Sequence, residues 1–282
     1  MAMARCLFVS DLHGSKERYH KLFRLVLAET PAVVFLGGDL LPACPLSGMA
    51  SFFHEIIKPG FAGLRAAMRA SYPRVFLIMG NDDPRKLEEL FQDRSDGLWE
   101  YLSCRQAEFD GHLIFGYPFV PPTPFMLKDW ERYDVSRYVD PGCISPEEGW
   151  RSTSLDVGEA RHRTIQSDLY ELLGEQDLSS AILLLHTPPY QTALDRAALD
   201  GQVIDSVPLD VNVGSIAVRR LIENRRPLVS LHGHIHESAR LTGSWREQIG
   251  ATWAFSAAHD GPELALVRFD PDALEDANRS LL

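Results

Sequence analysis

Residues 231–237 read Leu-His-Gly-His-Ile-His-Glu and end a short apolar run, Pro-Leu-Val-Ser-Leu, that begins at residue 227. Three histidines within five residues are hard to explain by packing alone. In a turn just beyond a strand, His234 and His236 can direct their imidazoles at a common point, and Gly233 lets the backbone bend sharply. Neutral imidazole is a good ligand for first-row divalent metals. Taken by itself, the stretch could equally be a surface cluster of histidines without a ligand role.

The rest of the chain has the composition of an ordinary globular protein, with 282 residues, 45% of them apolar and 24% charged. That size can bury one large core or two small ones. No apolar run approaches the roughly 20 residues needed to span a bilayer, and residues 1–5 lead into a strand-like run without a secretory segment. The cysteines, Cys6, Cys44, Cys104 and Cys143, are scattered and favour a reducing compartment over a disulfide framework. We therefore expect a cytoplasmic location.

The formal net charge of −11 argues against nonspecific binding to nucleic acid or to an anionic membrane surface. Divalent cations bound among acidic side chains would invert the local field. A site for phosphate groups is therefore compatible with the acidic composition.

The first third of the chain repeats one rhythm three times: an apolar strand, a loop containing Gly, Asp or Asn, and a helical pattern. Strands are expected over 5–10, 32–36 and 74–79, and helices over 15–29, 48–71 and 84–91. The second helix should break at Pro59–Gly60, and Asp82 or Asp83 should cap the third. This rhythm predicts a parallel α/β core with its polar groups at the carboxyl ends of the strands.

The strand-loop-helix pattern does not continue into the middle of the chain. Residues 105–119 look like a hairpin that turns at Asp110–Gly111. The segment from Tyr117 to about Gly158 is rich in proline and aromatic residues and has no clean period. We expect an ordered lid or wall over the site, with a packing appendage as the alternative.

The last part of the chain returns to regular patterns. Helices are expected over 158–173 and 215–224, buried strands over 181–185 and 227–231, a loop over 205–213, and antiparallel strands around 241–245, 251–255 and 264–269. No linker or internal repeat forces a boundary, so we expect one domain over residues 1–282, with the insertion at about 117–158.

Nitrogen and oxygen ligands follow the ends of the buried strands along the whole chain. A parallel arrangement would bring them to one end of the fold, where such a set can hold two divalent cations that share a carboxylate. Each residue alone has an ordinary explanation, such as a helix cap, a turn or a histidine at the edge of the core. The seven candidate metal ligands are Asp11, His13, Asp39, Asn81, His186, His234 and His236.

The chain resembles the calcineurin-like metallophosphoesterases, and it is most similar to their smaller bacterial and archaeal members. The resemblance rests on five blocks in the family's order: Asp11-Leu12-His13, Gly38-Asp39, Gly80-Asn81, His186 after an apolar strand, and Gly233-His234-Ile235-His236. It implies an α/β fold, a four-layer α/β/β/α sandwich with two mixed sheets packed face to face and helices outside. It also implies one metal bound by Asp11, His13, Asp39 and His236, and a second bound by Asp39, Asn81, His186 and His234, with Asp39 bridging.

The activity that the resemblance implies is metal-dependent hydrolysis of phosphate esters. Two cations roughly 3.5–4 Å apart lower the pKa of a bridging water, and the resulting hydroxide attacks phosphorus in line. The cations also neutralise charge on the phosphate oxygens. We expect two divalent ions, with manganese as the first choice and iron, zinc, nickel or cobalt as alternatives. The expected partner is a small phosphoester substrate. The sequence does not indicate an oligomeric state.

One block departs from the family pattern. Many members have Gly-Asn-His before an acidic residue, and that histidine contacts the scissile phosphate or helps the leaving group. Here the block is Gly80-Asn81-Asp82-Asp83. A carboxylate at Asp82 would repel a dianionic monoester more than a diester, which favours a phosphodiesterase over a phosphomonoesterase. Asp82 is therefore a candidate catalytic residue, with capping of the next helix as the alternative.

His232 is the spare histidine of the stretch and the second candidate catalytic residue. It could support the metal ligands or donate a proton in place of the missing histidine, with a plain structural role as the alternative. His259, Asp260 and Arg132 are weaker candidates.

Two competing hypotheses remain beside the enzyme. A metal-binding scaffold with little or no turnover could result from Asp82 replacing the histidine, although a scaffold does not need a complete ligand set. A mononuclear metalloprotein of another class disagrees with the number of ligands.

Overall fold

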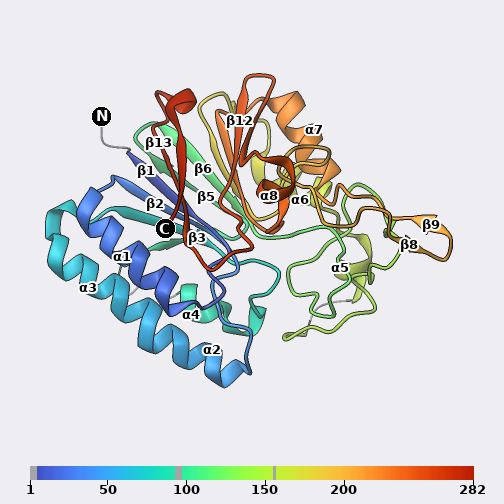
Figure 1. Cartoon of the computed structure of the whole chain (residues 1–282), viewed down its shortest axis with the longest axis horizontal. Helices are drawn as coiled ribbons and strands as arrows, with labels where there is room; N and C mark the ends of the chain where they lie inside the picture. Colours follow the sequence, from blue (N-terminus) through green and yellow to red (C-terminus); the bar gives the residue numbers. More distant parts are fainter. Residues whose placement is uncertain (1–4, 93–96, 155–156) are drawn as a thin grey trace.

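The computed structural model describes residues 5–92, 97–154 and 157–282. One set of strands consists of β1 (Cys6–Val9), β2 (Val33–Gly37), β3 (Arg74–Ile78), β4 (Glu100–Tyr101), β13 (Ala265–Phe269) and β14 (Asn278–Leu281). The other consists of β5 (Arg105–Phe109), β6 (His112–Tyr117), β7 (Ile182–Leu185), β10 (Val229–His232), β11 (Arg246–Ile249) and β12 (Thr252–Ser256). They form two six-stranded sheets, in the orders β14-β13-β1-β2-β3-β4 and β11-β12-β10-β7-β6-β5 (Figure 1).

Both sheets are mixed. In the first, β1, β2, β3 and β4 are parallel, while β13 runs antiparallel to β1 and to β14. In the second, β6, β7, β10 and β12 are parallel, while β5 and β11 run antiparallel at the two edges. The parallel strands at the centre of each sheet are the apolar runs that the sequence shows, because such strands are buried on both faces.

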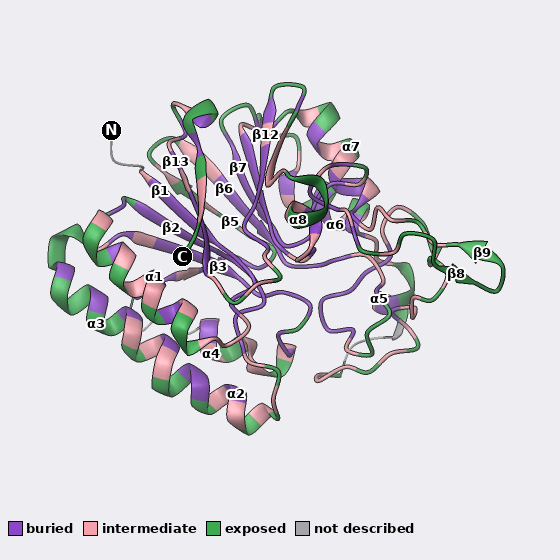
Figure 2. Ribbon diagram, viewed as in Figure 1, coloured by how far each residue is buried: buried purple, intermediate pink, exposed green. Residues whose placement is uncertain are grey.

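The sheets pack face to face over an aromatic core. Side chains alternate along β1, so Phe8 points into the core between the sheets while Leu7 and Val9 join the core under the helices. Phe255 of the second sheet lies 5.8 Å from Phe269 of the first, measured between ring centroids. Figure 2 shows the buried strands at the centre and the exposed positions on the helices and outer loops.

Helices cover the outer face of each sheet. The helices α1 (Lys16–Glu29) and α3 (Lys58–Met68) lie on the first sheet, and α6 (Ile165–Leu173) and α7 (Ile216–Arg225) lie on the second (Figure 1). The α1 helix begins after Ser15, whose hydroxyl accepts the backbone N–H of Arg18. The predicted four-layer α/β/β/α sandwich is confirmed.

The predicted break at Pro59–Gly60 is wrong. The helix continues through α2 (Leu46–Phe52), a π-helical turn over Phe53–Ile57, and α3. Pro59 lies in the first turn of α3, where its missing N–H is tolerated. The wider π-helical turn just before it, where the backbone N–H of Lys58 donates to the carbonyl of Phe53, accommodates the proline.

The predicted cap of the next helix is also wrong. A 3-10 turn over Arg85–Leu87 leads into α4 (Glu88–Gln92), and its N-cap residue is Pro84, which has no side-chain group to cap it. The N–H of Arg85 instead donates to a carboxylate oxygen of Asp129 at 2.8 Å. Asp82 and Asp83 are therefore available for other partners.

Three further elements differ from the prediction. Residues 158–173 form two helices, α5 (Val157–His162) and α6, because Thr164 and Ser167 form a capping box that begins a new helix. Residues 241–245 are not a strand, since α8 (Ser238–Thr242) precedes β11 there. A small hairpin, β8 (Val203–Ile204) and β9 (Val207–Pro208), replaces the first part of the loop expected over 205–213.

The segment between β6 and α5 contains isolated bridge pairs rather than helices or sheet strands in its described residues. It is held by internal and external contacts. The fully buried Lys128 and Glu131 form an ion pair with 2.5 Å between Nζ and Oε2, and the indole nitrogen of Trp130 donates to the carbonyl of Asp83 at 2.8 Å. The carboxylate of Asp134 accepts the N–H of Ile216 at the start of α7. The segment is thus fixed to the loop after β3.

None of the helices within residues 5–92, 97–154 and 157–282 is long and apolar enough to cross a membrane.

Candidate metal centre

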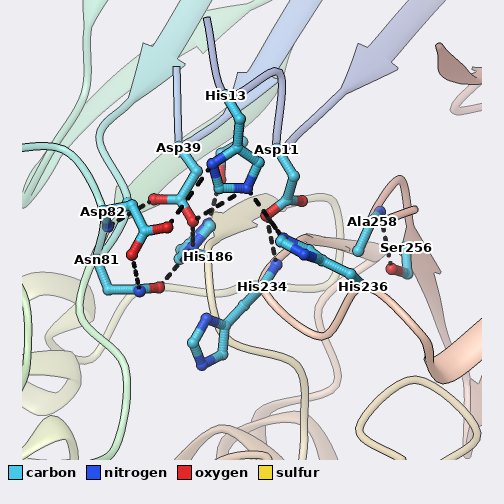
Figure 3. Close-up of polar contacts among 12 residues, drawn as sticks. Asp11, His13, Asp39, Asn81, Asp82, His186, His234, His236, Ser256 and Ala258 are labelled. Carbon is cyan, nitrogen blue, oxygen red and sulfur yellow. Dashed lines mark hydrogen bonds and ion pairs between the residues drawn. The ribbon is translucent and has the colours of Figure 1, made fainter. Parts of the chain in front are cut away.

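The candidate ligands all follow the carboxyl ends of parallel strands. Asp11 and His13 follow β1, Asp39 follows β2, and Asn81 follows β3 in the first sheet. His186 follows β7, and His234 and His236 follow β10 in the second sheet. Because the sheets face each other, the two sets of loops meet at one end of the sandwich (Figure 3).

Four of these residues form a tight group, and each offers one ligand atom within 4.8 Å of the others: Asp11, His13, Asp39 and His236. The Nε2 atoms of His13 and His236 are 3.0 Å apart. Nε2 of His236 lies 3.3 Å from Oδ1 of Asp11, and Nε2 of His13 lies 3.9 Å from Oδ2 of Asp39. Two imidazoles and two carboxylates facing one another are a donor set suited to a borderline divalent cation.

Asp11 gives a second indication of a cation. Its side chain is fully buried, and its Oδ2 has no hydrogen-bond donor among the described residues. A buried carboxylate oxygen without a partner is costly unless it is paired or coordinates a metal. The tight group therefore fits a bound metal.

The backbone of the ligand loops is unusual. Asp11, His13, Asp39 and His234 have φ angles of 54°, 43°, 53° and 72°, in the left-handed region that residues other than glycine rarely adopt. Such strain persists only where surrounding contacts impose it, and it clusters at functional sites. Here the N–H of Asp11 donates to the carbonyl of Gly38, and the N–H of His13 donates to the carbonyl of Asp39. The first two ligand loops are thus locked together.

Two glycines of the motif leave no room for a side chain. A Cβ on Gly80 would lie 2.3 Å from Oδ1 of Asp39, and a Cβ on Gly233 would lie 2.0 Å from Oγ of Ser10 and 2.5 Å from Oδ2 of Asp11. Both glycines therefore let a backbone segment approach a ligand carboxylate closely.

Replacing Gly233 by alanine is expected to weaken metal binding by about 10-fold to 100-fold, the range seen when groups around metal ligands are disturbed. The added Cβ must displace Ser10 or Asp11. Metal titration of the purified protein measures the effect. Gly63→Ala is the matched control, because Gly63 lies in α3 with nothing within 4 Å of its added Cβ. Equal affinities for the two variants would contradict the close approach at Gly233.

The second predicted ligand group is looser. Nε2 of His186 lies 3.2 Å from Oδ2 of Asp39 and 3.1 Å from Oδ1 of Asn81, and its Nδ1 lies 2.7 Å from the carbonyl of Gly37. That carbonyl can fix the ring with Nδ1 protonated, which leaves Nε2 as the ligand atom. The His234 ring centroid lies 5.3 Å from that of His186. The backbone N–H of His234 donates to the carboxylate of Asp11. The His234 ring lies on the other side of the backbone from the tight group (Figure 3).

The electrostatics of the site favour bound positive charge. Although burial favours the neutral acid, His236 holds the pKa of Asp11 well below its usual range, and His186 lowers the pKa of Asp39. Burial opposes the charged form of His186 and His236 as well, but the carboxylates raise their pKa values to about 10 and about 9. A divalent cation bound here would displace any proton from the ligand nitrogens of these histidines. Burial lowers the pKa of His234 to about 3, so its imidazole is neutral, as a ligand must be.

Asp82 faces the tight group and is half exposed. Its Oδ1 accepts a hydrogen bond from the Asn81 amide at 2.9 Å, and its Oδ2 lies 3.7 Å from Nδ1 of His13. Its backbone N–H donates to Oδ1 of Asp39 at 2.8 Å. Partial burial and the charge of Asp39 raise the pKa of Asp82 to about 6. Asp82 is therefore at the site and not at a helix cap.

Asp83 is a site residue that the sequence predicted only as a possible cap. It is fully buried, and its carboxylate accepts the N–H groups of Leu40, Leu41 and Gly80 at 2.9–3.1 Å. It therefore joins the loop that carries Asp39 to the loop that carries Asn81. A second acid directly after Asp82 was the available signal in the sequence.

Arg18 was missed as well. Its Nη1 donates to the carbonyl of Asp11 at 2.6 Å, and its Nη2 donates to the carbonyl of Gly261. Arg18 thus holds the first ligand loop against the loop after β12. No local sequence signal distinguishes it from the other charged residues of its helix.

The remaining candidates have partners elsewhere. Both ring nitrogens of the buried His232 are engaged, Nδ1 2.9 Å from the carbonyl of Thr187 and Nε2 2.9 Å from Oγ of Ser230. Burial lowers the pKa of His232 to about 4. These contacts are those of a structural histidine. The weaker candidates also form pairs, which are His259 with Glu263, Asp260 with Arg240, and Arg132 with Glu159 and Asp168.

The family model for calcineurin-like phosphoesterases matches residues 4–238. The chain belongs to this family. No curated protein sequence matches it.

Several solved structures are similar to it in fold. One crystal structure has a TM-score of 0.60 with 15% identity, and one of a Thermus thermophilus protein has a TM-score of 0.53 with 17% identity, each covering 99% of both chains. A dimetal phosphatase from Danio rerio has a TM-score of 0.49 with 11% identity, over 95% of this chain and 93% of that one.

Proposed function

We propose that this protein is a dinuclear metal-dependent phosphodiesterase. The observation that carries the proposal is the tight group of Asp11, His13, Asp39 and His236 in a chain of the calcineurin-like phosphoesterase family. These four residues would hold one divalent ion, and Asp39, Asn81 and His186 would hold the other. His234 would complete this second set once its ring turns toward the ion. Two bound divalent ions would supply an activated water and would neutralise charge on the phosphate. Manganese is our first choice of metal, and the ligand set also suits iron, zinc, nickel or cobalt.

The chain's own residues would position this centre. The carbonyl of Gly37 orients the His186 ring, and the N–H of Asp82 orients the carboxylate of Asp39. The carboxylate of Asp83 fixes the spacing of the second and third ligand loops. His232 would support the backbone beside these loops through its bonds to Thr187 and Ser230.

The preference for diesters rests on Asp82. Its carboxylate lies beside His13, where a phosphate bound at the metals would meet a negative charge. A dianionic monoester suffers more from that repulsion than a diester with a single charge. Phosphomonoester hydrolysis and a metal-binding scaffold with little turnover are the alternatives.

We further propose that the segment 117–158, of which 155 and 156 lie outside the described residues, forms a wall of the substrate site within a single domain of 282 residues. The contacts of Trp130 with Asp83, and of Asp129 with Arg85, support this role, because both attach the segment to the loop that follows Asn81.

Metal analysis with an ester assay tests the proposed function. We expect two divalent ions per chain after loading, and hydrolysis of bis-p-nitrophenyl phosphate in the presence of Mn²⁺. Hydrolysis of p-nitrophenyl phosphate should be slower than that of the diester. Tight metal binding without turnover of either ester would favour the scaffold, and faster monoester turnover would favour a phosphomonoesterase.

Replacing Asp82 by asparagine is expected to raise the rate ratio of monoester to diester by about tenfold, because the substitution removes one negative charge near the phosphate. Diester turnover should stay within an order of magnitude of wild type. The two p-nitrophenyl esters measure both rates. Asp272→Asn is the control, since it removes one negative charge from an exposed residue that is not a candidate ligand. The Asp272 carboxylate pairs with Arg5 at 3.3 Å. A diester loss of about 10²-fold would instead show that Asp82 acts as a general acid or base.

A further inference from the structure

A cleft lies beside the edges of the two sheets, where β4 and β5 are the outermost strands. Its volume is about 670 Å³, and its walls come from β5, β6, α6 and the segment that contains Trp130. None of the seven candidate metal ligands lines it. Its lining includes four arginines: Arg85, Arg105, Arg132 and Arg163.

Three arginines at this cleft lie over aromatic rings. The guanidinium carbon of Arg132 is 4.4 Å from the ring centroid of Phe119, and that of Arg85 is 5.2 Å from the ring centroid of Trp130. Arg105 lies over Tyr101 at 5.7 Å. Stacking on a ring restrains a guanidinium while leaving the N–H donors at its edge free to bind oxygen acceptors.

The four arginines differ in how far their charge is neutralised. Arg132 pairs with Glu159 and Asp168, and Arg163 pairs with Asp168 and Glu171. Arg105 has no carboxylate partner within the described residues. Arg85 reaches Glu88 only through Nε, at 3.4 Å. Two restrained guanidinium groups therefore keep donors for an anion.

We propose that this cleft is a binding site for a phosphorylated small molecule, separate from the metal centre. Planar guanidinium groups match the oxygens of a phosphate in pairs. A volume of about 670 Å³ lies in the range of small-molecule sites and exceeds what inorganic phosphate alone would fill. The phosphate contacts Arg85 and Arg105, and the organic part of the ligand fills the rest of the cleft. The lining also includes the carboxylates Glu88, Asp168 and Glu171, so the four arginines exceed the acidic side chains by one.

Calorimetric titration of the metal-free protein tests this site. The probes are adenosine monophosphate, inorganic pyrophosphate and adenosine. We expect both phosphates to bind and adenosine to give no heat. Arg105→Gln and Arg85→Gln should each weaken binding of adenosine monophosphate by at least tenfold. Arg24→Gln, on the exposed face of α1, should leave the affinity unchanged.

Two further measurements keep the test decisive. Thermal melts of the variants check that they fold, since a fold defect would move the melting temperature as well as the affinity. His236→Gln alters the metal centre and should leave the affinity of the cleft for adenosine monophosphate unchanged. Binding lost in His236→Gln but kept in Arg105→Gln would place the anion at the metal centre and overturn the proposal, as would the absence of binding by both phosphates. Both of these outcomes concern anion binding alone and leave the proposed phosphodiester hydrolysis at the metal centre unaffected.

Discussion

Replacing Asp39 by asparagine is expected to reduce phosphodiester hydrolysis by roughly 10³-fold or more, equivalent to about 4 kcal/mol of lost transition-state stabilisation. Asp39 is buried between both ligand groups. Its Oδ2 lies 3.9 Å from Nε2 of His13 and 3.2 Å from Nε2 of His186. Asparagine keeps the shape of the side chain and removes the negative charge that the two proposed metals would share.

The Asp39→Asn variant should also bind fewer metal ions. The metal count therefore distinguishes an enzyme that has lost metal from one that keeps both metals but reacts slowly. We expect fewer than two ions per chain in metal analysis, together with the loss of bis-p-nitrophenyl phosphate hydrolysis in Mn²⁺. Asp272→Asn should match wild type in both measurements. Turnover within tenfold of wild type in Asp39→Asn would contradict a shared carboxylate at the reaction centre.

Replacing Asp83 by alanine is expected to lower the free energy of unfolding by roughly 3 kcal/mol or more, since a buried donor left without a partner costs about 1–3 kcal/mol. Three buried N–H groups, those of Leu40, Leu41 and Gly80, would lose their acceptor. Asp83→Asn should cost less, because its amide oxygen can still accept hydrogen bonds. Burial and Asp39 raise the pKa of Asp83 to about 7, so the loss of its charge is a smaller change than the loss of its oxygens.

Urea unfolding of the metal-free variants measures this effect without a contribution from metal binding. Asp82→Ala is the matched control, because among the described residues the half-exposed carboxylate of Asp82 accepts a hydrogen bond only from Asn81. Its unfolding midpoint should stay close to that of wild type. An Asp83→Ala midpoint equal to that of Asp82→Ala would show that Asp83 does not hold the two loops together.

Much of the fold was predictable because its strands are buried on both faces. The runs that became β1, β2, β3, β7 and β10 are largely apolar, and each is followed closely by a polar residue of the site. Parallel strands place their carboxyl ends together, so the order of the motifs predicted which loops would meet. The bounds of the helices were less predictable, since the capping box at Thr164 and the π-helical turn before Pro59 are local choices that apolar periodicity does not specify.

The sequence by itself determined the parallel α/β core and the loops in which the candidate ligands lie, because these depend on apolar runs and on motifs that are local in the chain. The layered sandwich followed only from the resemblance of those motifs to a known family. Only the tertiary structure decided which partners the charged residues take. Asp83 binds backbone groups more than 40 positions away, Asp82 turns to His13, and Arg105 is left without a carboxylate partner within the described residues. These pairings are set by distances between segments remote in sequence, and the spacing of residues along a chain does not contain those distances.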